Sequence, residues 1–213
     1  MSDQRGIVAL KSATGVIAGL TAFASTIIML TGLDQAAATM GFIPARVSGL
    51  LDLAPAVPTW LTPLSATLVH GGFIHLLLNL VMLVWVGAQV ERVLGAANII
   101  NAYLVGAFVA AAAQWVVTPD SLTPMVGASG AISALFGIYA LLAGRPKPLT
   151  RSSGLNRAIH AAWLLAAWIV IQWMTAQLAG GQGVLIATPA HIGGFIAGLL
   201  LERPLRVWRY RGA

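Results

Sequence analysis

Three short polar clusters lie within otherwise apolar stretches and hold the residue types that serine-based hydrolysis requires. One is Gly127-Ala-Ser129-Gly130, the second is centred on His191, and the third holds His75 and Asn79. A serine hydroxyl is a weak nucleophile unless a base accepts its proton, and histidine is the side chain here whose pKa suits that task. We therefore interpret Ser129 as a candidate nucleophile and His191 as its candidate base.

The third cluster could stabilise the negative charge that develops when a carbonyl is attacked. His75 and Asn79 stand at positions i and i+4, so on a helix they share one face, and both side chains can donate hydrogen bonds. Together with the backbone N–H of Ser129 they could form an oxyanion hole. No carboxylate lies near these residues in the sequence, so the pattern favours a Ser–His dyad over a triad.

We expect neither a metal nor another cofactor. Cysteine is absent from the chain. The sequence has no H-E-x-x-H motif, and no acidic residue accompanies the histidines.

Each cluster also has a purely structural interpretation. A lone serine in a membrane helix usually bonds back to a backbone carbonyl. Gly194-x-x-x-Gly198 by itself indicates only close helix packing in lipid, although packing against the Ser129 stretch would bring His191 beside the serine. For His70 we expect hydrogen bonding within the loop that precedes it. Three tryptophans are most simply packing or lipid contacts: Trp163, Trp168 and Trp173.

The composition requires these clusters to be positioned by membrane helices. The chain is 58% hydrophobic and 8% charged, against about 25% charged residues in a soluble domain. A helix needs about 20 apolar residues to cross about 30 Å of hydrocarbon. Six stretches have that length: 13–33, 72–90, 98–117, 125–143, 158–178 and 184–201. We therefore expect an all-α polytopic bundle of six transmembrane helices, with a long structured loop over 34–71 at the membrane interface.

The basic residues predict how this bundle is oriented. With the N-terminus in the cytoplasm, eleven of the 12 Lys and Arg residues fall on the cytoplasmic side, and Arg46 alone falls outside. Their spread over four separate segments argues against nucleic acid as a partner. We expect one membrane domain over 1–213, with a cytoplasmic N-terminus (1–12), a six-helix core (13–203) and a basic cytoplasmic tail (204–213) that meets anionic lipid headgroups.

Counting along the helices places the three clusters at one depth. Spans two, four and six run from outside to inside, so all three clusters lie toward the outer side. At about 1.5 Å per residue, Ser129 and His75 lie roughly 22 Å from the inner ends of their spans and His191 roughly 16 Å. These positions agree within about one helical turn, below the outer surface of the membrane.

These motifs together resemble those of the rhomboid family, over residues of about 41 to 202. The resemblance is carried by four motifs in order: His70…His75-x-x-x-Asn79, Glu91-Arg92, Gly127-Ala-Ser129-Gly130 and Ala190-His191-x-x-Gly194-x-x-x-Gly198. It implies the basic six-span bacterial form, in the inner membrane. It also implies an intramembrane serine endopeptidase that cleaves transmembrane segments of membrane proteins near the outer boundary.

The resemblance also implies roles for individual residues. Ser129 would be the nucleophile and His191 the base, with His75, Asn79 and the Ser129 amide as the oxyanion hole. Glu91 and Arg92 would pin a cytoplasmic turn. The segment 34–71 would be the family's membrane-embedded loop, and span five with the loop at 179–189 would be the gate and cap over the site.

The sequence departs from the family pattern at one position. Many rhomboids carry an aromatic residue four positions after the nucleophile, stacked on the catalytic histidine, and here that position is Ser133. A rival hypothesis is a non-enzymatic relative that binds transmembrane helices, but such relatives lack the serine or the histidine. A small transporter would carry polar groups along a path through the whole bilayer, whereas these reach only partway.

Overall fold

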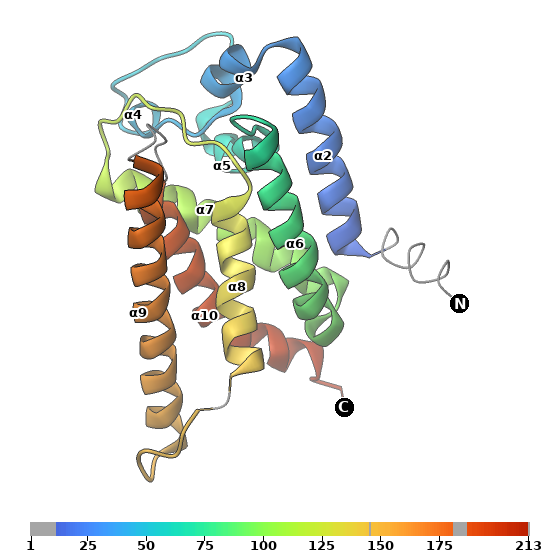
Figure 1. Cartoon of the computed structure of the whole chain (residues 1–213), viewed down its shortest axis with the longest axis vertical. Coiled ribbons are helices and arrows are strands. Elements are labelled where there is room, and N and C mark those ends of the chain that lie inside the picture. Colours follow the sequence, from blue (N-terminus) through green and yellow to red (C-terminus); the bar gives the residue numbers. More distant parts are fainter. Residues whose placement is uncertain (1–11, 145, 181–186, 213) are drawn as a thin grey trace.

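The described part of the chain is an all-helical bundle, as the sequence predicted. The computed structural model describes residues 12–144, 146–180 and 187–212, so most of the segment 1–12 and of the proposed cap at 179–189 lies outside the described residues. The long helices in this part are α2 (Ala13–Thr31), α6 (Phe73–Leu94), α7 (Ala96–Val117), α8 (Ser129–Ala143), α9 (Ser153–Gly180) and α10 (Thr188–Arg209) (Figure 1).

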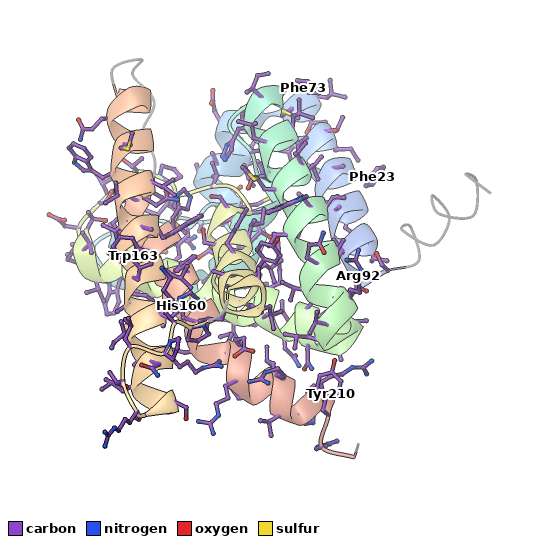
Figure 2. All side chains as sticks on the ribbon, turned by 60° about the horizontal axis from the view of Figure 1, so that its bottom comes forward. Phe23, Phe73, Arg92, His160, Trp163 and Tyr210 are labelled. Carbon is purple, nitrogen blue, oxygen red and sulfur yellow. The ribbon has the colours of Figure 1, made fainter. Side chains whose placement is uncertain are left out.

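Length and composition allow several of these helices to cross a membrane. Among the described residues, 4 helices qualify: Ala13–Thr31, Phe73–Leu94, Ala96–Val117 and Ser153–Met174. α8 is apolar but has only 15 residues, and the second half of α10 carries charged side chains. Large apolar side chains such as those of Phe23 and Phe73 are exposed and lie at the periphery of the bundle (Figure 2). This is the arrangement expected of a protein that lipid surrounds, and the count of six spans stays a prediction.

α8 lies at the centre of the bundle, packed against α6, α7 and α10 (Figure 1). The buried apolar residues of α8 are small or branched, and two of them, Leu135 and Ile138, are fully buried. They pack in one core with Leu83 of α6 and Ile99 of α7. Because neighbours surround α8, its first residue is held at a fixed place among the surrounding helices.

The loop after α2 is structured, as predicted. It contains α3 (Leu33–Met40), α4 (Pro44–Val47) and α5 (Thr62–Ser65), with short 3-10 turns at Thr59–Leu61 and Ala66–Leu68. Phe42 exchanges two backbone hydrogen bonds with Met125, just before α8, and is buried, whereas Leu50 and Trp60 are exposed. The loop is thereby fixed to the end of the bundle where α8 begins.

The opposite end of the bundle gathers the charged residues. Glu202 of α10 is buried and forms ion pairs with Arg157 and with Arg206, the latter at 2.9 Å. α10 also continues through Pro204 to Arg209, although the sequence placed a separate tail from residue 204. Hydrogen bonds to α6 and α7 explain the extension: Asn98 Nδ2 donates to the Leu205 carbonyl, and the Tyr210 hydroxyl to the Val93 carbonyl.

Glu91 and Arg92 differ in their contacts. The Glu91 carboxylate accepts hydrogen bonds from the backbone N–H groups of Ala13 and Thr14, each at 2.8 Å, and also from the Thr14 hydroxyl. It therefore caps the start of α2, where unpaired N–H groups and the helix dipole favour a negative charge. Arg92 is exposed, and its partner among the described residues is Gln89 of its own helix. The family resemblance implied that both residues pin a cytoplasmic turn, and the long-range contact belongs to Glu91.

We predict that Glu91→Ala lowers the free energy of unfolding by about 2 kcal/mol, because the N–H groups of Ala13 and Thr14 lose their acceptor. Arg92→Ala is the matched control, and its effect should stay below about 0.5 kcal/mol because its side chain is exposed. Thermal unfolding in detergent measures both. Equal destabilisation by the two variants would contradict the capping role.

Candidate active site

Ser129 and His191 meet between the two helices that pack most closely. Ser129 is the first residue of α8, and its Oγ lies 2.7 Å from Nε2 of His191, in the first turn of α10. Both side chains are half-buried. The hydroxyl and the imidazole are thus within the distance at which a proton can pass between them.

The backbone before Ser129 is held by the loop rather than by α8. Gly127 adopts a φ of 110°, in the left-handed region that favours glycine, and its N–H donates to the Ala66 carbonyl at 2.9 Å. A Cβ at this position would lie 2.8 Å from the His75 ring. The sharp turn at Gly127 therefore brings the histidine of α6 close to Ser129.

His70 links α2 to this turn. Ser25 of α2 donates its hydroxyl proton to the Leu68 carbonyl at 2.7 Å, so at 2.9 Å it accepts from His70 Nδ1. His70 Nε2 then accepts from the N–H of Ala128 at 3.4 Å. His70 is 0% exposed, and these partners in α2 and before α8 show that the expectation of hydrogen bonding within the preceding loop was wrong. Burial, with the neighbouring His75, lowers the pKa of His70 to about 3, which keeps it neutral in this bridging arrangement.

Two residues of α9 complete the surroundings of His191. Oε1 of Gln172 lies 2.8 Å from His191 Nδ1, and Trp168 donates its indole N–H to the His191 carbonyl at 3.2 Å. The Trp168 ring also stacks on Phe195 of α10, with centroids 4.8 Å apart. The sequence predicted only packing or lipid contact for Trp168, and no sequence motif includes Gln172. An uncharged polar residue within an apolar span was the signal for Gln172.

His75 lies beside Gly127, and Asn79 follows it one turn along α6. His75 Nδ1 accepts from the N–H of Gly71 at 3.2 Å, so the neutral ring carries its proton on Nε2, the atom beside Gly127. Asn79 is buried, and its Nδ2 donates to the His75 carbonyl at 2.9 Å. An amide nitrogen has two protons, so one donor of Asn79 is left for another acceptor.

Small residues allow α10 to approach α8 backbone to backbone. A Cβ at Gly194 would lie 2.1 Å from the Gly130 carbonyl oxygen, and one at Gly198 would lie 2.0 Å from that of Ala134. Gly194 therefore stands one turn of α10 from His191 and contacts the residue after Ser129. This contact places the side chains of Ser129 and His191 side by side.

Ser133 occupies the position where an aromatic residue would stack on the histidine. Its hydroxyl donates to the Ser129 carbonyl at 2.8 Å. A Cβ added at Gly194 would lie 3.1 Å from the Ser133 Cβ. The side chain is buried in this narrow contact, so a larger ring would have to displace α10. Trp168 stacks on Phe195 instead of on His191.

The described residues form no group of three or more His, Cys, Asp or Glu side chains that could hold a metal ion. The site therefore consists of a hydroxyl, imidazoles and amides. This set can transfer a proton and stabilise an oxyanion.

Comparison with known proteins gives a family for this arrangement. The family model for the rhomboid domain matches residues 58–207. Rhomboid protease GlpG of Pectobacterium atrosepticum is 36% identical over 140 residues, which are 64% of this chain and 45% of that protein. RHOMBOID-like protein 4 of Arabidopsis thaliana is 31% identical over 140 residues, 65% of this chain and 32% of the relative. The chain thus spans less than half the length of these relatives.

We predict that Gly194→Ala lowers the free energy of unfolding by about 1–3 kcal/mol, because the added methyl group forces α10 away from α8. Gly19→Ala is the matched control, since Gly19 of α2 has nothing within 4 Å of an added Cβ. It should gain up to about 1 kcal/mol from helix propensity. Thermal unfolding in detergent compares the two, and equal stability would refute the packing argument.

Proposed function

The chain belongs to the rhomboid family, and on that premise we propose that it is an intramembrane serine endopeptidase with a Ser129–His191 dyad. The observation that carries the proposal is the 2.7 Å contact between Ser129 Oγ and His191 Nε2. Relatives with matching segments are named as rhomboid proteases, including GlpG and the putative YdcA of Bacillus subtilis.

The proposed reaction begins with proton transfer within the dyad. His191 Nε2 accepts the hydroxyl proton as Ser129 Oγ attacks the scissile carbonyl carbon, and the carbonyl oxygen becomes an oxyanion. The donors for this charge would be Nε2–H of His75, Nδ2–H of Asn79 and the Ser129 amide. His191 then gives its proton to the departing amine. Water, activated by the same imidazole, hydrolyses the acyl-enzyme and restores the serine.

The proposed substrates are transmembrane segments of other membrane proteins, cut near the outer boundary. The dyad lies at the end of α8 that is remote from Glu202 and Arg157, and the positive-inside rule puts those charges in the cytoplasm. Both termini would then be cytoplasmic, and the basic end of α10 would meet anionic lipid. We place the protein in a bacterial inner membrane, without a metal, a cofactor or a nucleic acid in the reaction.

A helix-binding relative without activity is the second candidate. It would need no hydrogen bond between a hydroxyl and an imidazole, and no oxyanion donors. The presence of both Ser129 and His191 at hydrogen-bond distance favours the enzyme.

We predict that Ser129→Ala lowers the cleavage of a labelled transmembrane substrate in liposomes by more than about 10³-fold, because the nucleophile is lost. Ser133→Ala, one turn along the same helix, is the matched control and should retain activity within about tenfold, because it removes only a hydrogen bond to a carbonyl. A fluorophosphonate should label the parent and not the Ser129 variant. Cleavage that persists in Ser129→Ala would overturn the nucleophile assignment.

We predict that His75→Ala and Asn79→Ala each lower kcat by about 10²–10³-fold with little change in KM, because an oxyanion donor acts chiefly in the transition state. Asn101→Ala, at an exposed position of α7, is the control for the amide substitution. The same liposome assay gives kcat and KM. A rise in KM with kcat unchanged would assign these residues to substrate binding instead.

A further inference from the structure

We propose that Gln172 is the positioning residue of the active site, holding His191 in the tautomer and orientation that let it act as a base. The proposal rests on the function proposed above. It assigns the role that a carboxylate has in a triad to a neutral amide on a different helix.

Gln172 lies at hydrogen-bond distance from the imidazole of His191. Its side chain is 8% exposed, and its Oε1 lies 2.8 Å from His191 Nδ1 while Ser129 Oγ lies 2.7 Å from Nε2 of the same ring. The imidazole is therefore held at both nitrogens, by α9 on one side and by α8 on the other. A ring with both nitrogens engaged cannot rotate without losing a hydrogen bond.

The chemistry requires an acceptor at Nδ1. A neutral imidazole has one N–H and one bare nitrogen, and the base must present the bare nitrogen to the serine. An amide oxygen only accepts, so Oε1 of Gln172 draws the proton to Nδ1 and leaves Nε2 free. With the opposite tautomer, two lone pairs would face each other across 2.8 Å. When Nε2 takes the serine proton, the same oxygen stabilises the imidazolium.

No other described group supplies this function. Ser133 is turned to the Ser129 carbonyl and offers no ring for stacking. The Glu91 carboxylate is bonded to the first N–H groups of α2, and the Glu202 carboxylate is paired with two arginines. Trp168, one turn before Gln172, contacts the backbone of His191 and the ring of Phe195 rather than the imidazole nitrogens.

The position of Gln172 makes the base dependent on α9. In the most apolar stretch of α9, 6% of the residues are buried, against 44% in that of α7. α9 is therefore the less firmly packed of the two helices. Trp168 fixes it to α10 through its indole N–H and its stacking on Phe195. Any movement of α9 away from α10 therefore removes the acceptor from His191.

The test compares Gln172→Leu with Gln172→Glu in liposomes with a labelled transmembrane substrate. Gln172→Leu should lower kcat about tenfold or more with KM nearly unchanged, because it removes one hydrogen bond that stabilises the imidazolium. Gln172→Glu keeps an oxygen acceptor of the same length and should restore kcat to within about threefold of the parent. Gln177→Leu, the same change at an exposed position of α9, is the matched control and should behave as the parent.

A second readout does not depend on turnover. The chain has 4 histidines, so ¹⁵N-histidine labelling in detergent resolves their tautomers, and the His191→Ala spectrum assigns the His191 signals. The parent and Gln172→Glu should show the proton of His191 on Nδ1, and Gln172→Leu should show a shift toward Nε2. Thermal unfolding of each variant verifies that the fold is retained.

The outcomes separate this proposal from the proposed function. If the parent cleaves no substrate and takes no fluorophosphonate label, the protease function fails, and the tautomer of His191 still decides the role of Gln172. A parent proton on Nε2 overturns the proposal. So does a loss of kcat in Gln172→Leu without a change of tautomer, or a change of tautomer without a loss of kcat.

Discussion

The structure depends on one close contact between α10 and α8. Glycines of α10 at this contact have no side chain, so the two backbones touch directly. Gly194 meets the Gly130 carbonyl and Gly198 meets the Ala134 carbonyl at distances that exclude any Cβ. In lipid there is no hydrophobic force between helices, so such contacts and hydrogen bonds supply the attraction. Because His191 is on α10 and Ser129 begins α8, the separation of these two backbones sets the distance between hydroxyl and imidazole.

Polar groups at membrane depth are costly unless they are paired, and this cost explains how the histidines are arranged. His70 joins Ser25 to the Ala128 amide, His75 accepts from Gly71, and His191 is held between Ser129 and Gln172. His70 and His191 are each bonded by two segments remote in the sequence, whereas His75 is bonded by Gly71, just before its own helix. The loop, α2 and α9 thereby contribute to a site whose proposed dyad comes from α8 and α10.

Much of the fold could be predicted from the sequence because apolar length and charge asymmetry are local properties. The helices fall close to the stretches expected, and the loop after α2 is structured. The differences lie at helix ends: α8 begins only at Ser129, and α10 passes Pro204. Local composition cannot place these ends, since the bonds between Gly127 and Ala66 and between Asn98 and Leu205 join residues far apart in the chain.

The sequence by itself identified the residues that could act and predicted that they would meet toward one side of the membrane. Spacing along helices and the count of basic residues define a depth for Ser129, His75 and His191, because the rise per residue is fixed. Only the tertiary structure decided the contacts between helices: His70 on the Ala128 N–H, Glu91 at the start of α2, and Gln172 against His191. Those contacts depend on how helices face one another, and no periodicity within a single helix contains that information.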